Sequence, residues 1–207
     1  MIEKLIHAEC ALFDFDGVVA DTEPLYVELD RRALAALGYE ATDEELEGFV
    51  GKASEVEGPA LLARHGIQAT EADYLAVWDS YRDIYGSPEL APNPGLPELW
   101  VRLRKRGRRI AVVSTTRCAS LVRALNNFGL LTYVDAIVGR EMVSRMKPDP
   151  EPYLRALEIL GVDAADAVAF DDSSSGVASA RAAGVYTVCY RGDSVADARL
   201  MDFRDLL

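Results

Sequence analysis

The chain has 207 residues, and its 34 acidic and 22 basic side chains give a formal net charge of −12. This excess of negative charge argues against a protein that binds nucleic acid or an anionic membrane through its general surface. Hydrophobic residues make up 50% and charged residues 27% of the chain, which excludes a disordered protein and suits one globular domain or a domain with an insertion.

No apolar run approaches the ~20 residues that cross a bilayer, and the first five residues lack the apolar stretch of a signal peptide. The three cysteines are odd in number and widely spaced, which favours small buried side chains in a reducing compartment over disulfides or a metal site. We therefore expect a cytoplasmic protein with no membrane partner.

Short apolar runs predict the buried strands of a parallel sheet. The runs are continuous rather than alternating, which is typical of strands covered on both faces, and several end at Gly, Ser or Asp. They lie at residues 10–17, 110–113, 136–138, 167–170 and 185–190.

Helical patterns separate these runs in the second half of the chain. Residues 96–106, 117–128 and 151–160 carry apolar side chains at helical spacing, and each stretch is closed by a glycine. Strands that alternate with helices predict an α/β fold, a Rossmann-like parallel sheet with right-handed crossovers.

The segment at residues 18–92 breaks this alternation. It contains helical stretches near 24–37, 53–65 and 71–85, no convincing strand, and a proline cluster at its end. We expect a helical cap domain inserted after the first strand, with residues 1–17 and 93–207 forming the core. Residues 18–92 contain 16 acidic and 5 basic side chains, so they account for −11 of the net charge.

Polar side chains stand at or just beyond the carboxyl ends of the predicted strands, where ligands bind in open α/β sheets. Carboxylates gathered there would repel one another unless a cation joined them, and oxygen ligands without His or Cys suit Mg²⁺. Mg²⁺ often takes a phosphate oxygen as well, so the pattern points to phosphoryl chemistry. The candidates are Asp14, Asp16, Ser114, Lys147, Asp171 and Asp172.

Four segments resemble the motifs of the haloacid dehalogenase-like superfamily. Residues 14–24 (DFDGVVADTEP) resemble the first motif, and Ser114 after its apolar strand resembles the second. Residues 147–153 (KPDPEPY) resemble the third, and residues 170–176 (FDDSSSG) resemble the fourth. The motifs occur in order, and the inserted helices are similar to the cap of the phosphoglucomutase and sugar-phosphatase branch.

The resemblance implies a role for each motif. Asp14 would attack phosphorus and form an aspartyl-phosphate. Asp16 would protonate the leaving oxygen and then activate water. Ser114 would hydrogen-bond the transferred phosphoryl group, and Lys147 would neutralise its charge.

The same resemblance implies a metal site. Mg²⁺ would be held by Asp14, the backbone carbonyl of Asp16, and Asp172. Asp171 would either coordinate the ion or support a group that does.

Two features favour a hydrolase over a hexose-phosphate mutase. Tyr26 stands where related mutases carry a His, and the segment around Lys52 lacks the Arg that grips a second phosphate. We therefore expect Mg²⁺-dependent hydrolysis of a small phosphomonoester, a sugar or polyol phosphate. Further substrate contacts are expected from Glu23, Tyr26 and Lys52 in the cap and from Thr115, Thr116 and Arg117 after the second motif.

Alternatives remain open from the residues alone. The protein could be a mutase of the same family or a non-catalytic module that binds a sugar phosphate or a protein. Ser114 and the Asp171–Asp172 pair could cap helices, Lys147 could be a solvated loop lysine, and the basic run at residues 102–109 could bind nucleic acid instead of ending a helix. We expect a small phosphorylated metabolite as the partner, no nucleic acid, and a monomer or weak homo-oligomer.

Overall fold

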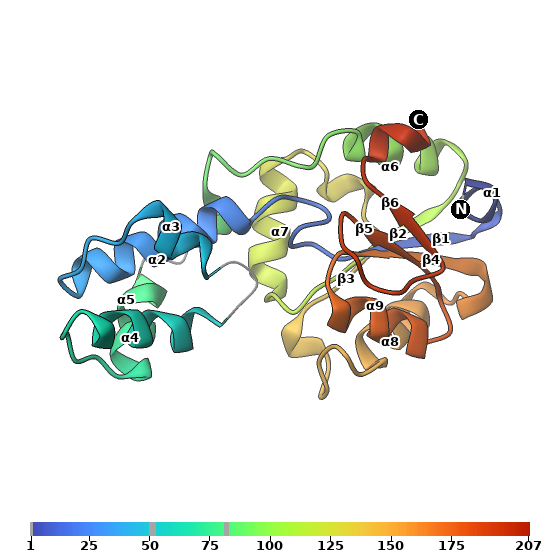
Figure 1. The fold of residues 1–207 in the computed structure, drawn as a ribbon. Helices are drawn as coiled ribbons and strands as arrows, with labels where there is room; N and C mark the ends of the chain where they lie inside the picture. Colours follow the sequence, from blue (N-terminus) through green and yellow to red (C-terminus); the bar gives the residue numbers. More distant parts are fainter. Residues whose placement is uncertain (1, 50–52, 81–82) are drawn as a thin grey trace. The chain divides into compact units, whose positions relative to one another are not determined.

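The computed structural model describes residues 2–49, 53–80 and 83–207. Within these ranges the chain forms two compact units. The core unit, Met1–Asp21 with Pro88–Leu207, carries the sheet, and the helical unit, Thr22–Ser87, is inserted between its two pieces (Figure 1). Each unit has its own hydrophobic core.

One parallel sheet of six strands organises the described part of the core unit, in the order β3-β2-β1-β4-β5-β6. Its direction of winding reverses next to β1, and ligands bind beyond the carboxyl ends of the strands at such a reversal. The strands are β1 (Cys10–Phe13), β2 (Arg109–Val113), β3 (Ala136–Val138), β4 (Ala167–Asp171), β5 (Tyr186–Tyr190) and β6 (Ala198–Leu200).

Helices cover both faces of this sheet (Figure 1). On one face Leu12 belongs to a core cluster with Tyr153 and Leu157 of α8. On the other face Phe13 stacks on Phe170, with ring centroids 4.9 Å apart, and contacts Trp100 of α6. The helices of this unit are α1 (Ile2–His7), α6 (Leu96–Lys105), α7 (Cys118–Asn127), α8 (Glu151–Leu160) and α9 (Ser174–Ala182).

The helical unit packs its helices around a second apolar cluster. Leu34, Leu46, Leu61 and Tyr74 are buried in it, one from each helix. The unit contains α2 (Glu23–Ala36), α3 (Asp43–Glu47), α4 (Ser54–Arg64) and α5 (Glu71–Ser80). Single turns of 3-10 helix complete the described structure at Ile84–Gly86, Leu131–Tyr133, Arg140–Met142, Ala164–Asp166 and Phe203–Leu206.

The predicted α/β fold with a parallel sheet is confirmed. The helix expected over 71–85 is α-helical only to Ser80 in the described residues, and 84–86 form a 3-10 turn.

The sequence patterns also missed α1, α3 and β6. These elements have three to six residues each, too few for a hydrophobic period, and α3 depends on a capping box between Thr42 and Glu45. No described helix is long and apolar enough to cross a membrane.

Candidate active site

The carboxyl ends of β1 and β4 bring the predicted catalytic carboxylates together. Asp14 follows the last residue of β1, and Asp171 is the last residue of the neighbouring β4. Oxygen atoms of Asp14, Asp171 and Asp172 all lie within 4.8 Å of one another. Asp14 and Asp171 are buried, so their charges interact strongly.

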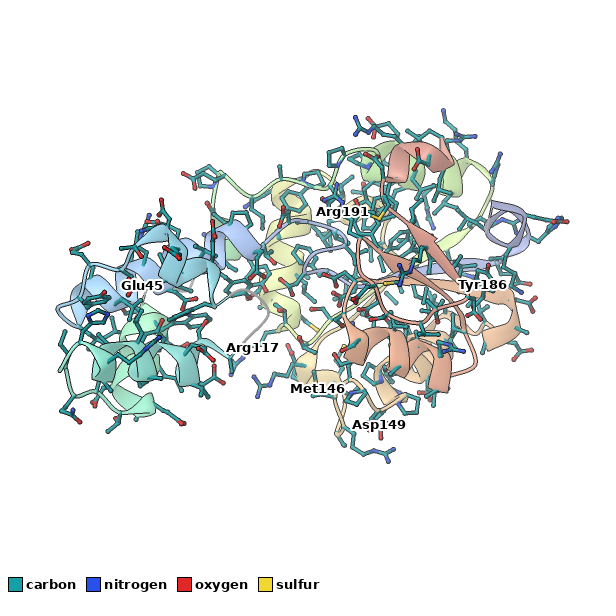
Figure 2. All side chains as sticks on the ribbon, in the orientation of Figure 1. Glu45, Arg117, Met146, Asp149, Tyr186 and Arg191 are labelled. Atoms are coloured by element: carbon teal, nitrogen blue, oxygen red, sulfur yellow. The ribbon has the colours of Figure 1, made fainter. Side chains whose placement is uncertain are left out.

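Lys147 supplies a positive charge inside this cluster. Its Nζ donates hydrogen bonds to Asp14 Oδ1 at 2.6 Å and to Asp171 Oδ2 at 2.7 Å. The side chain is only 3% exposed, which excludes a solvated loop lysine. Although burial alone would lower the pKa of Lys147, the two carboxylates raise it above its usual value, so the ammonium persists. Lys147 belongs to the segment between the 3-10 turn Arg140–Met142 and α8, in which Figure 2 labels Met146 and Asp149.

The Lys147 ammonium also supports the charge of Asp14. Burial raises the pKa of Asp14, and the nearby carboxylates of Asp171 and Asp16 raise it further, whereas Lys147 lowers it. An ionised Asp14 at neutral pH therefore depends on the ammonium at 2.6 Å. The net result is a pKa of Asp14 well above its usual value, with burial as the largest cause, so Lys147 offsets only part of the cost of ionising this carboxyl group.

Asp171 is completely buried and is held by four donors. Oδ1 accepts from the backbone N–H of Ser173 at 3.0 Å and from its hydroxyl at 2.9 Å. Oδ2 accepts from Tyr153 Oη at 2.6 Å and from Lys147 Nζ. These bonds occupy both oxygens, so Asp171 is better placed to orient Lys147 than to coordinate a metal ion. The cap of α9 is Ser173, whose hydroxyl accepts from the N–H of Gly176, so Asp171 and Asp172 do not cap this helix themselves.

Asp172 is the more accessible member of the acidic pair. Burial and the neighbouring Asp171 raise the pKa of Asp172 to about 6. Gly17, with φ +78°, leaves room for this side chain, because a Cβ atom there would lie 2.0 Å from Asp172 Oδ2. The chain turns here with a positive φ and with no space for a side chain, and glycine permits both.

The donor set fits a hard divalent cation. Three carboxylates with one ammonium leave the cluster with an excess of negative charge, and all of its ligand atoms are oxygens. Asp14 and Asp172 have oxygens that could coordinate the ion. Such a cation would relieve the repulsion that raises the pKa of Asp172.

Asp16 faces a separate set of hydroxyl groups. Its Oδ2 accepts from Thr116 Oγ1 at 3.0 Å and lies 3.4 Å from Ser114 Oγ. Ser114 is 2% exposed and its Oγ accepts from the backbone N–H of Thr116. The N-cap residue of α7 is Arg117, and no side chain caps this helix by a hydrogen bond. Ser114 is therefore not a helix cap.

The remaining predicted contacts divide between the two units. Thr115 and Arg117 are exposed in the turn between β2 and α7 (Figure 2), whereas Thr116 turns to Asp16. Glu23 and Tyr26 belong to the helical unit and line a cavity of about 290 Å³ there. Lys52 lies outside the described residues.

A buried carboxylate that the sequence patterns missed also lines this cavity. Asp30 is 2% exposed and accepts hydrogen bonds from Tyr74 Oη at 2.7 Å, Trp78 Nε1 at 2.8 Å and Ser54 Oγ at 2.8 Å. Burial raises the pKa of Asp30, and these donors oppose the rise. A helical wheel of α2 would have placed this acid on the apolar face with Ala33 and Leu34, which is the signal for it.

Tyr153 is a second residue whose role the sequence patterns missed, although it belongs to the third motif. Its ring is completely buried, its hydroxyl donates to Asp171, and the Lys147 ammonium lies 5.3 Å from the ring centroid.

The basic run at 102–109 is partly neutralised within the core unit, since Arg104 pairs with Asp135 and Arg109 with Glu9.

The chain is similar to known proteins over most of its length. The family described as haloacid dehalogenase-like hydrolase matches residues 11–190. A phosphorylated carbohydrates phosphatase of Thermotoga maritima is 34% identical over 178 residues, 86% of this chain and 82% of that protein. A plasmid phosphoglycolate phosphatase of Cupriavidus necator is 36% identical over 183 residues, 84% of this chain and 77% of that protein. The crystal structure of a candidate beta-phosphoglucomutase from Thermotoga maritima matches with a TM-score of 0.82 and 28% identity, covering 96% of both chains.

Proposed function

The chain belongs to the haloacid dehalogenase-like hydrolase family as a phosphatase, and we propose that it hydrolyses a small sugar or polyol phosphate with Mg²⁺ and an aspartyl-phosphate intermediate. The observation that carries this proposal is the contact between Asp14 and the buried Lys147 ammonium. The ammonium lowers the cost of ionising a buried nucleophilic carboxyl group at the reversal point of the sheet.

The first step is attack of an Asp14 carboxylate oxygen on phosphorus. The bond from phosphorus to the ester oxygen breaks, and Asp16 donates a proton to the leaving alkoxide. Lys147 is placed to offset the charge of the phosphoryl oxygens, and Ser114 can donate its hydroxyl hydrogen to one of them. Asp16 lies close enough to Asp14 for its charge to raise the pKa of Asp14, which supports a role for both carboxyl groups at one phosphoryl group.

The second step is hydrolysis of the aspartyl-phosphate. Asp16, now ionised, removes a proton from water, and the water oxygen attacks phosphorus. The phosphorus–oxygen bond to Asp14 breaks, which releases inorganic phosphate and restores both carboxyl groups.

Asp14 and Asp172 are the side chains proposed to hold Mg²⁺, with the Asp16 carbonyl as a further oxygen donor. Bound Mg²⁺ would supply positive charge to the phosphoryl group during transfer. Asp171 would keep Lys147 beside Asp14, since its own oxygens are occupied by four donors.

The cavity of the helical unit supports a hydroxyl-rich substrate. Its lining includes the acidic residues Glu23 and Glu55 and the aromatic residues Tyr26 and Trp78, whose rings stack with centroids 5.9 Å apart. Carboxylates accept hydrogen bonds from sugar hydroxyls and repel a second phosphate. This favours a monophosphorylated sugar or polyol.

A phosphomutase is the second candidate, favoured by the similarity to the candidate beta-phosphoglucomutase. Tyr26 stands where a mutase of this family would carry a His. Its hydroxyl shares a hydrogen bond with the hydroxyl of Tyr85, with the two oxygens 2.9 Å apart. A phenol has an ordinary pKa near 10, so it is a poorer proton carrier than imidazole at neutral pH. A mutase would need a bisphosphorylated activator and would release no net phosphate.

The deciding experiment is a phosphate-release screen over many phosphorylated metabolites, with and without Mg²⁺. The proposal predicts Mg²⁺-dependent release from at least one sugar or polyol phosphate, and none with Asp14→Asn. Isomerised sugar phosphate without phosphate release would favour the mutase. No turnover of any phosphoester by the folded wild-type protein would reject both.

A further inference from the structure

Asn93 binds the turn that follows the catalytic carboxylates. Its Nδ2 donates to the backbone carbonyls of Gly17 at 2.9 Å and of Val18 at 2.8 Å. Its backbone N–H donates to the carbonyl of Val19 at 2.8 Å. One residue from the proline-rich segment before α6 therefore holds three consecutive carbonyl groups of the turn.

The side chain of Asn93 uses all of its strong hydrogen-bonding groups. Both hydrogens of its amide go to the two carbonyls, and Oδ1 accepts from a guanidinium nitrogen of Arg191 at 3.1 Å. The residue is 3% exposed, so a broken bond would leave a buried polar atom without its partner. Two carbonyl acceptors also fix which end of the amide carries nitrogen.

Arg191 is itself held in an unusual backbone conformation. It is the one non-glycine residue with a positive φ, 55°, among the described parts of the chain. It follows β5 (Figure 2), its Nε donates to the carbonyl of Met201 at 3.2 Å, and its guanidinium lies 5.0 Å from the ring centroid of Tyr190. Such conformations persist where surrounding contacts enforce them, often at functional sites.

The turn held by Asn93 lies next to two carboxylates of the candidate active site, Asp16 and Asp172. It begins directly after Asp16, and Gly17 lies against Asp172 so closely that a Cβ atom would overlap the carboxylate. Inside the turn, the N–H of Gly17 donates to the carbonyl of Ala20 at 2.8 Å, and the N–H of Val19 to that of Phe15 at 2.9 Å. A displaced turn would therefore shift Asp16 and Asp172 together.

We propose that Asn93 is a positioning residue for catalysis, which sets the turn at residues 17–19 and through it the placement of Asp16 and Asp172. This inference rests on the proposed phosphatase function for its kinetic consequence. The structural tether itself is independent of the reaction. Asn93 contacts none of the carboxyl groups directly, so its effect is transmitted through the backbone that it binds.

Asn93→Asp is the sharpest test, because the two side chains have nearly the same shape. The carboxylate keeps an acceptor for Arg191 but has no hydrogen to donate, and its oxygen would face two carbonyl oxygens. We expect kcat to fall by about 10- to 100-fold with a change in KM below about threefold, since small misplacements of catalytic groups have effects of this size. Asn127→Asp, the same change at an exposed site of α7, is the matched control.

Amide hydrogen exchange separates positioning from general loss of structure. In Asn93→Asp we expect faster exchange at residues 17–20 and unchanged exchange in β1 and β2. Arg191→Met should produce a smaller effect in both measurements. Failure of the wild-type protein to hydrolyse any phosphomonoester would reject the proposed function, whereas the exchange comparison would still decide whether the tether exists.

Three results would overturn the inference. The first is unchanged exchange at residues 17–20 in Asn93→Asp. The second is exchange that rises equally in the sheet, which indicates loss of global stability. The third is locally faster exchange with wild-type kcat, because the turn would then be loosened without consequence for catalysis.

Discussion

The two units of this chain contain buried carboxylates with different partners. Asp171 in the core unit is fully buried and is held by an ammonium group as well as by neutral donors. Asp30 in the helical unit is buried among a phenol, an indole and a hydroxyl, with no cation among its described hydrogen-bond partners. The difference teaches that burial alone does not mark a catalytic carboxylate.

Charge pairing provides the distinction. In the core unit, Lys147 joins Asp14 and Asp171, and the remaining negative charge suits a divalent cation. In the helical unit, the three donors of Asp30 tie α2 to α4 and α5. We therefore expect substitutions in the core unit to abolish chemistry, and those at Asp30 to affect mainly stability.

The largest expected effect belongs to Asp14→Asn. The amide has nearly the same shape but is a very poor nucleophile, so turnover should fall by about three orders of magnitude or more. Fold and thermal stability should change little, because the substitution also removes one charge from a crowded cluster. Phosphate release and circular dichroism measured on the same samples test this, and turnover near the wild-type level would reject the nucleophile assignment.

Lys147→Met should reduce both activity and stability. Loss of the ammonium leaves Asp14 and Asp171 buried without their cation, which costs about 3–5 kcal/mol of unfolding free energy. The pKa of Asp14 would rise further, so less of the nucleophile is ionised and kcat should fall by at least about 100-fold. Lys105→Met, at an exposed lysine of α6, is the control. An unchanged kcat in Lys147→Met would contradict the role of this ammonium.

The raised pKa of Asp172, about 6, makes the stability of the folded protein depend on pH. The metal-free folded protein binds this proton more tightly than the unfolded chain, so its contribution to stability is present below pH ~4 and is lost as the pH rises through about 6. The change in the free energy of unfolding across this pH range is about 3 kcal/mol.

Mg²⁺ should reverse this loss, because it requires the ionised carboxylate. We predict that Mg²⁺ raises the melting temperature at pH 8 much more than at pH 5, and that Asp172→Asn removes the difference. Thermal melts across this range, with Mg²⁺ or with a chelator, measure it. Equal stabilisation at both pH values would count against the metal site.

Asp30→Ala should destabilise the helical unit by about 2–3 kcal/mol, since it removes the carboxylate to which the buried Tyr74 hydroxyl and the Trp78 indole N–H donate. Asp30→Asn keeps an acceptor and should be close to wild type at neutral pH. Because burial raises the pKa of Asp30, the wild-type protein should gain stability relative to Asp30→Asn as the pH is lowered. Urea unfolding of the three proteins at two pH values tests the contrast, and a selective loss of kcat in folded Asp30→Asn would oppose a structural role.

The smallest expected effect is that of Thr116→Val. It removes the hydroxyl that donates to Asp16 Oδ2 at 3.0 Å, and kcat should fall by about 10-fold or less. Thr132→Val, the same change at an exposed threonine of the turn Leu131–Tyr133, should leave kcat unchanged. If Thr116→Val instead raised KM alone, Thr116 would be a substrate contact, as the sequence motif first indicated.

The sheet and most helices were predictable because their patterns are local. The apolar run before Asp14 predicts a strand, and the helical spacing in residues 151–160 predicts a helix. β6 was not predictable, since its three residues range from buried to exposed at the edge of the sheet. The motif residues of the site were predictable because polar residues at parallel strand ends converge.

The contacts among those residues were not predictable. Lys147 reaches Asp14 across 133 positions of sequence, and Asn93 reaches Gly17 across 76. Nothing in the local pattern says that Thr116 turns to Asp16 or that Asp30 meets Trp78. Such pairings depend on how the elements pack, and only the folded chain specifies them.

The most direct test of the central claim is to look for the phosphorylated enzyme. Wild-type protein, mixed briefly with a substrate found in the screen and quenched in acid, should carry one phosphoryl group on the peptide that contains Asp14. The group should be removed by hydroxylamine, as expected of an acyl phosphate, and should be absent from Asp14→Asn. Phosphate release without any such group, or equal labelling of Asp14→Asn, would contradict the account.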